Sequence, residues 1–199
     1  MEQSRRLALF DFDGTITTRD TLMEITRYYS GTAKFYRGLA YLSIPLVLQR
    51  SGMITAQQAK ERFLTYFFSG IALDDFNEMC SGFATQILPA MIRPGARAAI
   101  DRHKPADDRV IIVSASPHHW IAPWANAVVI EVIATRLEVI DGRITGKIEG
   151  RNCNGDEKVA RIRQHVNIDD YSEVEAYGDT KGDKPMLAIA GKVHWKPFR

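Results

Sequence analysis

The segment LALFDFDGT at residues 7–15 constrains this chain most, because an apolar run leads directly into two carboxylates and a glycine. The apolar half predicts a buried β-strand whose exit carries charge. Side chains alternate along an extended chain, so Asp11 and Asp13 lie on one side and Phe12 on the other. Two neighbouring carboxylates need a cation or a shared proton. Ligands of open α/β sheets bind at the carboxyl ends of the strands, so we expect a reaction site here.

The composition is that of an ordinary globular protein with room for one core and an inserted module: 199 residues, 45% hydrophobic and 25% charged. It excludes disordered and fibrous classes. A formal net charge of +2 without long basic runs gives little support for a nucleic-acid partner, and we expect none. Cys80 and Cys153 lack metal-ligand spacing and do not make a disulfide scaffold. The absence of a disulfide scaffold and the polar residues 1–6 before the first strand favour a cytoplasmic location.

The stretch at residues 20–89 follows a helical pattern almost throughout, with Gly31, Gly52 and Gly70 as breaks. Asp20 is placed to accept the free amides of a first helix that begins at Thr21. A helical insertion between the first strand and the rest of the sheet would cover the site as a cap. We therefore expect a cap domain at residues 19–90 and a core domain formed by residues 1–18 and 91–199.

Residues 35–48 form an apolar run in which Arg37 is the only charge. The run is shorter than the roughly 20 residues needed to span a bilayer, and Pro45 would kink it. It either packs into the core of the cap, which we favour because runs of this length are usually buried, or lies at a membrane surface. For the second alternative, Arg27, Lys34, Arg37 and Arg50 are available to meet anionic headgroups.

A second predicted strand also ends in polar residues. The β-branched run at residues 109–114 is typical of a parallel strand covered on both faces. It leads into Ser114-Ala115-Ser116-Pro117, where the Ser114 hydroxyl and the Ala115 amide are arranged to hold a phosphoryl oxygen. Ser116 and Pro117 are expected to cap and start a helix over residues 117–126.

The last third of the chain has two more polar segments, one at the start of a predicted helix and one at the end of a predicted strand. Lys158 falls in the first turns of a helix predicted at residues 153–166, where a cation is disfavoured unless an anion accompanies it. A strand at residues 174–177 leads into GDTKGD at 178–183. Between these regions, alternation around Asp141-Gly142 predicts a hairpin beside the main sheet, to which we assign no chemistry.

In order, these segments carry DxDGT, Ser, Lys and GDxxxD. In this order and with βα spacing, they resemble the haloacid dehalogenase superfamily of aspartate-nucleophile phosphohydrolases over nearly the whole chain. The helical insertion directly after DxDGT is similar to the subgroup with a cap at that point, which includes phosphoserine phosphatase. The resemblance implies an α/β fold, with a Rossmann-like parallel sheet and a helical cap inserted after the first strand.

The resemblance further implies a Mg²⁺-dependent phosphomonoester hydrolase that works through an aspartyl-phosphate. Asp11 would attack phosphorus, and Asp13 would protonate the leaving alcohol and then activate water. Ser114 and Lys158 would neutralise the transferring phosphoryl oxygens.

Oxygen ligands for Mg²⁺ are implied at four positions, and such ligands suit this hard cation. They are the Asp11 carboxylate, the Asp13 carbonyl group, Asp179 and Asp183. We expect substrate contacts at Thr15, Asp20, Ala115 and Lys181.

The substrate stays open between soluble phosphomonoesters, phosphoserine among them, and a lipid phosphomonoester. Asp20 stands where phosphoserine phosphatases carry a glutamate, and Lys181 interrupts their GDGxND pattern. The spacing Asp179-x-Lys181-x-Asp183 and the sequence HWKP at 194–197 look more like a bacterial branch that contains phosphatidylglycerophosphate phosphatases. For that alternative we expect peripheral contact with the inner membrane through the cap.

Two further alternatives are a phosphotransferase, which sequence does not separate from a hydrolase, and a non-catalytic phosphate-binding protein. The second is disfavoured because every matched position holds a residue capable of its role. Four aromatic residues follow Ser114 at helical spacing, and we expect them to pack against the sheet rather than line the site. They are His118, His119, Trp120 and Trp124.

Overall fold

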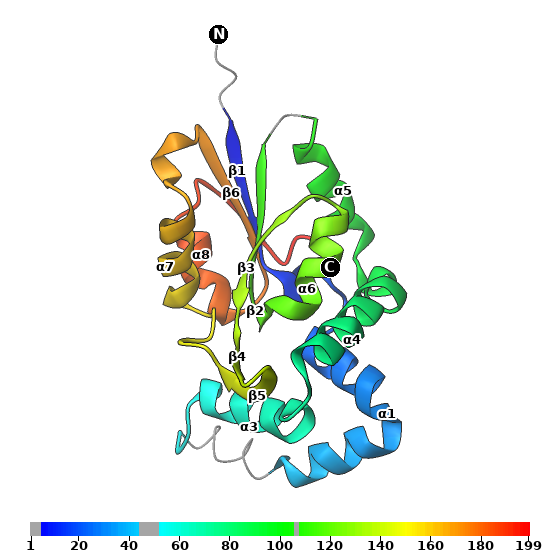
Figure 1. The fold of residues 1–199 in the computed structure, drawn as a ribbon. Helices are drawn as coiled ribbons and strands as arrows, with labels where there is room; N and C mark the ends of the chain where they lie inside the picture. Colours follow the sequence, from blue (N-terminus) through cyan, green and yellow to red (C-terminus); the bar gives the residue numbers. More distant parts are fainter. Residues whose placement is uncertain (1–4, 44–51, 106–107) are drawn as a thin grey trace.

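The computed structural model describes residues 5–43, 52–105 and 108–199 and has an α/β architecture (Figure 1). Its main sheet has the spatial order β3-β2-β1-β6-β7, and every neighbouring pair is parallel. These strands are β1 (Arg6–Phe10), β2 (Arg109–Pro117), β3 (Glu131–Thr135), β6 (Glu173–Gly178) and β7 (Lys192–Trp195). The prediction of a Rossmann-like parallel sheet is confirmed.

Helices connect and cover these strands. They are α1 (Thr21–Tyr41), α3 (Ala56–Phe68), α4 (Leu73–Gln86), α5 (Pro94–His103), α6 (His118–Ala127), α7 (Asp156–His165) and α8 (Lys184–Ala188). Short helical turns are η1 (Phe12–Ile16), η2 (Leu88–Met91), η3 (Ile168–Asp170) and η4 (Lys181–Asp183). Asp20 caps α1 as predicted, since its side chain accepts hydrogen bonds from the amides of Leu22 and Met23.

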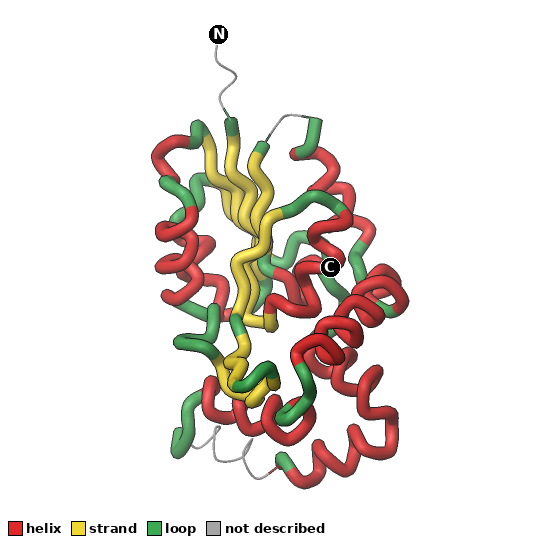
Figure 2. The backbone as a smooth tube through the Cα atoms, in the orientation of Figure 1, coloured by secondary structure: helices red, strands yellow, loops and turns green. Residues whose placement is uncertain are grey.

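The two faces of the sheet carry separate helical layers, as expected for parallel strands buried on both sides. Helices α5 and α6 pack on the face that presents Ala8 and Phe10. Helices α7 and α8 pack on the face that presents Leu7 and Leu9. Figure 1 shows these layers on either side of the sheet, and Figure 2 shows the strands running together towards one end. All carboxyl ends of this parallel sheet therefore open at the same end of the molecule.

Helices α1, α3 and α4 lie beyond those carboxyl ends, together with an antiparallel hairpin (Figure 1). The hairpin strands β4 (Leu137–Ile140) and β5 (Arg143–Ile148) form a separate two-stranded sheet. Strand β5 packs closely on α3, because a Cβ added to Gly146, whose φ is 83°, would lie 2.3 Å from the Cα of Thr65. The predicted hairpin is thus present and belongs with these helices.

The structure differs from the expectations in one additional strand and in two element boundaries. Strand β3 adds a parallel strand to the main sheet just before the hairpin, in a region where we expected only an antiparallel excursion. Strand β2 continues to Pro117, which therefore precedes α6 rather than starting it. A bulge between Ser114 and Pro117 allows this, because β2 stays paired with β3 while the Ser116 amide turns to the Ser114 hydroxyl, 3.0 Å away. Helix α7 begins three residues later than predicted, at Asp156.

The apolar run at residues 35–48 lies partly outside the described residues, which stop at 43 and resume at 52. Within its described part, Phe35 is buried and its ring centroid lies 6.4 Å from that of Phe67. Tyr36 and Tyr41 are exposed. None of the helices in the described ranges is long and apolar enough to cross a membrane. The beginning of the run therefore packs one face into the helical layer and presents tyrosines on another.

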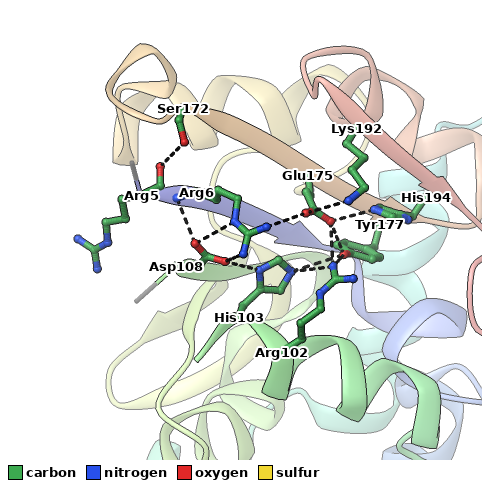
Figure 3. Close-up of polar contacts among 10 residues, drawn as sticks. All are labelled: Arg5, Arg6, Arg102, His103, Asp108, Ser172, Glu175, Tyr177, Lys192 and His194. Atoms are coloured by element: carbon green, nitrogen blue, oxygen red, sulfur yellow. Dashed lines mark hydrogen bonds and ion pairs between the residues drawn. The ribbon is translucent and has the colours of Figure 1, made fainter. Parts of the chain in front are cut away.

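A polar cluster ties β6 to β7 and α5 at one side of the sheet (Figure 3). The carboxylate of the fully buried Glu175 accepts hydrogen bonds from the Tyr177 hydroxyl at 2.7 Å, from His194 Nε2 at 3.0 Å and from Arg102 at 3.0 Å. The Tyr177 ring is stacked on Phe10 at 4.1 Å and on His194 at 4.2 Å. This cluster fixes the start of the C-terminal segment against the core.

Candidate active site

A cavity of about 310 Å³ opens at the carboxyl ends of the strands. Its walls come from the strand ends on one side and from α1 and α3 on the other. The lining residues are Asp11, Asp13, Asp20, Leu22, Met23, Ala56, Ala59, Lys60, Phe63, Ala115, Ser116, Asn154, Lys158, Thr180 and Asp183. Residues that follow the strands thus meet side chains from the inserted helices in one small space.

Three carboxylates converge beside this cavity, from the ends of β1 and β6. Asp11, Asp179 and Asp183 are buried, and each offers an oxygen within 4.8 Å of the others. The turn η1 makes this approach possible, because Gly14 has φ 81° and a Cβ there would lie 2.7 Å from Asp179 Oδ2. Glycine is required at this position both for its conformation and for its lack of a side chain. We call these three residues the acid triad.

Lys158 on α7 is the cation that pairs with two members of the acid triad. Its Nζ lies 2.6 Å from Asp11 Oδ1 and 2.7 Å from Asp183 Oδ1, and it also donates to the Val113 carbonyl group at 2.7 Å. Burial raises the pKa of Asp11 to about 7 against the opposing effect of Lys158, and the nearby Asp183 adds to the rise. Burial alone would lower the pKa of Lys158, but its two carboxylate partners outweigh that and raise it. The anionic partner predicted for Lys158 is therefore present.

Asp13 is held by the first residue of α1. Its Oδ1 accepts hydrogen bonds from the Thr21 amide and from the Thr21 hydroxyl, both at 2.7 Å. The Thr21 hydroxyl in turn accepts one from Trp120 Nε1 at 3.0 Å. Buried Trp120 packs in the core as expected, and its indole nitrogen also supports the side chain that orients Asp13.

The end of β2 brings Ala115 and Ser116, but not Ser114, to the wall of the cavity. Ser114 is fully buried, and its hydroxyl accepts a hydrogen bond from the Ser116 amide instead of facing the cavity. Ala115 and Ser116 line the cavity themselves. In this structure Ser114 shapes the turn that brings those two residues to the wall.

The remaining predicted substrate residues are distributed unevenly. Asp20 lines the cavity while one of its oxygens caps α1. Thr15 is buried and donates a hydrogen bond to Asp179 Oδ1 at 3.2 Å, away from the cavity lining. Lys181 is exposed, and its neighbour Thr180 lines the cavity instead.

Lys60 is a cavity residue that sequence reasoning missed. It comes from α3, and its Nζ donates to the Ala115 carbonyl group at 2.6 Å and to Asn152 Oδ1 at 3.2 Å. A signal for it existed, because Ala56, Ala59, Lys60 and Phe63 share one helical face. A lysine within an otherwise apolar stripe indicates a position that faces polar surroundings.

Arg199 was missed as well, and it reaches the acid triad from the C-terminal segment. This segment is anchored by the hydrogen bond from the Lys196 amide to the Gly178 carbonyl group at 2.9 Å. The Phe198 ring stacks on Tyr177 at 5.7 Å. Arg199 then forms an ion pair with Asp179.

The acid triad fits a hard divalent cation, because its donors are all carboxylate oxygens and lie close enough to share one ion. Asp11 and Asp183 are drawn together by Lys158, and Asp179 is held by Thr15 and Arg199. The side chains that would surround such an ion are thus already placed.

Residues 8–188 match the family model for haloacid dehalogenase-like hydrolases. The chain belongs to this family. Protein CicA of Caulobacter vibrioides is 33% identical over 199 residues, which cover 97% of this chain and 86% of CicA. A crystal structure of a protein of unknown function from Bordetella pertussis Tohama I has a TM-score of 0.82 at 28% identity and covers 96% of this chain and 89% of its own.

Phosphoserine phosphatase has the same fold. In a structure described as a phospho-aspartyl intermediate analogue, it gives a TM-score of 0.62 at 23% identity over 96% of this chain and 85% of that one. The predicted superfamily, the predicted α/β fold and the prediction of an enzyme of the phosphatase class are thereby confirmed.

Proposed function

We propose that this hydrolase cleaves phosphomonoesters through an aspartyl-phosphate on Asp11, with Mg²⁺ as its cofactor. The observation that carries the proposal is the position of Asp11 at the end of β1, where it lines the cavity together with Asp13 and Lys158. Phosphoserine phosphatase, which shares the fold, has been captured as an analogue of such a phospho-aspartyl intermediate. A carboxylate beside a cation and a second acid is suited to this two-step chemistry.

In the first step a carboxylate oxygen of Asp11 forms a bond to phosphorus, and the bond from phosphorus to the ester oxygen breaks. Asp13 gives its proton to the departing alkoxide, so the alcohol leaves neutral. In the second step Asp13 takes a proton from water, whose oxygen attacks phosphorus and releases Asp11 and inorganic phosphate. The hydrogen bonds from the Thr21 amide and hydroxyl orient the Asp13 carboxylate, which supports this role.

The phosphoryl oxygens carry the charge that must be stabilised. Lys158 and the backbone of Ala115 and Ser116 are the groups of the cavity wall suited to this. Ser114, which the sequence predicts to join them, accepts a hydrogen bond from the Ser116 amide and keeps its O–H as a donor. Mg²⁺ held by Asp11, the Asp13 carbonyl group, Asp179 and Asp183 would add positive charge at the same oxygens.

We further propose that residues 19–90 act as a cap over a core formed by residues 1–18 and 91–199, and that the cap selects the substrate. The cavity supports this, since α1 and α3 supply Leu22, Met23, Lys60 and Phe63 to its wall. The β4–β5 hairpin would move with the cap, because β5 packs against α3.

A soluble small-molecule phosphomonoester is the substrate class that the small cavity favours. A lipid phosphomonoester, such as phosphatidylglycerophosphate, is the second candidate, for an enzyme that contacts the inner membrane from the cytoplasm. The exposed tyrosines Tyr36, Tyr41 and Tyr66 on α1 and α3 favour it, because tyrosine is enriched at membrane interfaces.

The test is Mg²⁺-dependent release of phosphate from phosphoserine, small sugar phosphates and micellar phosphatidylglycerophosphate, with Asp11→Asn beside the wild type. We expect release that requires Mg²⁺ and is lost in Asp11→Asn, while circular dichroism shows the fold retained. Release from the lipid alone would support the membrane candidate. Undiminished activity in Asp11→Asn would contradict the proposed nucleophile, and transfer of phosphate to added alcohols would identify a phosphotransferase.

A further inference from the structure

The C-terminal segment at residues 196–199 brings a cation to the acid triad that the proposed chemistry does not use. Arg199 forms an ion pair with Asp179, whereas Lys158 pairs with the other two carboxylates. Within the described part of the chain, Arg199 is the only cation that pairs with Asp179. The third carboxylate of the triad therefore has a counter-charge of its own.

Several contacts direct this segment to the acid triad. The Lys196 amide donates to the Gly178 carbonyl group at 2.9 Å, and the backbone turns at Lys196 with φ 51°, a conformation that residues with a side chain rarely adopt. The Phe198 ring stacks on Tyr177 with centroids 5.7 Å apart, and the Phe198 carbonyl group accepts a hydrogen bond from Arg93 Nη1 at 3.4 Å. Such a backbone conformation persists where the surrounding contacts fix it. The position of the terminal guanidinium group is thus set by the fold and not by its ion pair alone.

Asp179 is also positioned by groups other than Arg199. Its Oδ1 accepts a hydrogen bond from the Thr15 hydroxyl at 3.2 Å, and its amide donates to Asp183 Oδ2 at 3.1 Å. Gly14 packs against its carboxylate, where an added Cβ would lie 2.7 Å from Oδ2. What Arg199 adds is charge, because Asp179 is buried and a buried carboxylate without a cation costs free energy. Arg199 therefore gives Asp179 the same compensation that a divalent cation on the triad would give.

Two positive charges at one carboxylate oppose each other. Coulomb repulsion from the guanidinium group lowers the affinity of the same carboxylate for a divalent cation. The Arg199 side chain is 46% exposed, so it can turn into solvent without opening the core.

We propose that Arg199 sets the affinity of the acid triad for Mg²⁺: it competes with the cation for Asp179 and turns into solvent when the cation binds. This inference rests on the proposed function, in which Mg²⁺ is the cofactor. It adds a residue that controls how firmly the cofactor is held.

The test is calorimetric titration of Mg²⁺ into the full chain, without substrate, for the wild type and Arg199→Gln. We expect Arg199→Gln to bind Mg²⁺ roughly 3- to 10-fold more tightly, because a repulsive charge is removed from the site. Arg199→Lys keeps the charge and should return the affinity towards the wild-type value. Arg97→Gln is the matched control, since Arg97 also pairs with an aspartate, Asp101, and is 48% exposed; it should bind Mg²⁺ as the wild type does.

Thermal unfolding gives a second readout that needs no enzymatic activity. Because Arg199 and Mg²⁺ compensate the same carboxylate, Arg199→Gln should lower Tm more in EDTA than in saturating Mg²⁺. The rise in Tm that Mg²⁺ produces is therefore expected to be larger in Arg199→Gln than in the wild type or in Arg97→Gln.

The outcomes separate this inference from the proposed function. Equal affinities of the wild type and Arg199→Gln for Mg²⁺ would overturn the inference alone. So would weaker binding by Arg199→Gln, since Arg199 would then serve to orient Asp179 for the cation. Absence of Mg²⁺ binding in both proteins would overturn the inference together with the proposed cofactor, whereas tighter binding by Arg199→Gln supports the inference even if no phosphate is ever released.

Discussion

Thr21 links three functions in one side chain: it begins α1, supports Asp13 and receives the indole N–H of Trp120. Neither composition nor periodicity distinguishes it from the other threonines of the segment. Its role arises because the insertion starts at the site itself, so that the first helical residue lies against the strand end. Orientation of Asp13 is thus supplied by the same residue that opens the inserted region.

We predict that Thr21→Val lowers kcat for an alkyl phosphate about tenfold with little change in KM, because one of two hydrogen bonds that orient Asp13 is lost. With 4-nitrophenyl phosphate the loss should be much smaller, since that leaving group departs without a proton. Thr26→Val removes a hydroxyl that only bonds the Leu22 carbonyl group in the same helix and serves as control. Equal losses with both substrates would argue for a general disturbance of the site.

The polar cluster between β6, β7 and α5 links three elements outside the active site (Figure 3). Burial disfavours ionisation of Glu175, but hydrogen bonds from Tyr177, His194 and Lys192 outweigh it and lower its pKa from 4.5 to about 2. The folded protein therefore favours the ionised carboxylate more than the unfolded chain does. Its contribution to stability is complete above about pH 4.5 and is lost as the pH falls towards 2.

We predict that the free energy of unfolding of the wild type falls by about 2 kcal/mol more between about pH 5 and pH 3 than that of Glu175→Gln. Urea unfolding at a series of pH values measures how the free energy of unfolding of each protein changes with pH. The comparison of these two slopes does not depend on the absolute stability of the variant. Glu78→Gln, at an exposed position of α4, should keep the wild-type slope. A Glu175→Gln slope that matches the wild type would show that other groups govern acid unfolding.

The contact between β5 and α3 permits no side chain at Gly146, which has a positive φ and faces the backbone of Thr65. We predict that Gly146→Ala destabilises the protein by about 1–2 kcal/mol more than Gly150→Ala. Gly150 is a matched control, since its φ of 74° is similar but an added Cβ would meet nothing within 4 Å. Thermal unfolding measures both, and similar losses would mean that backbone conformation, not the close approach, sets the cost.

For the molecule as a whole, the order of segments along the chain predicted the sheet and the meeting of Asp11, Lys158 and Asp183. Parallel topology brings strand ends together regardless of how far apart they lie in sequence, so the separation of 147 positions between Asp11 and Lys158 was no obstacle. Lys60 and Arg199 escaped prediction because their places depend on how α3 and the C-terminal segment pack. The hydrogen bond from the Ser116 amide to the Ser114 hydroxyl was not predicted, because the bulge that creates it leaves no pattern in the sequence.

Binding of a divalent cation to the acid triad should stabilise the entire fold, because its ligands come from the segments that follow β1 and β6. We predict that Mg²⁺ at about 100 times its dissociation constant adds about 2.7 kcal/mol to the free energy of unfolding, a rise of several degrees in Tm that EDTA reverses. Asp179→Asn should lose most of this response, whereas Asp141→Asn in the exposed hairpin turn should keep it. A full response in Asp179→Asn would place the ion elsewhere.

The C-terminal segment also has a practical consequence for protein production. Arg199 lies against Asp179, whereas the described chain begins at the opposite end of β1 (Figure 1). Any residues attached after Arg199, including an affinity tag, must leave from beside the acid triad. A tag at the N-terminus leaves that region free, so matched preparations tagged at either end are expected to differ in Mg²⁺ affinity even though their folded cores are identical.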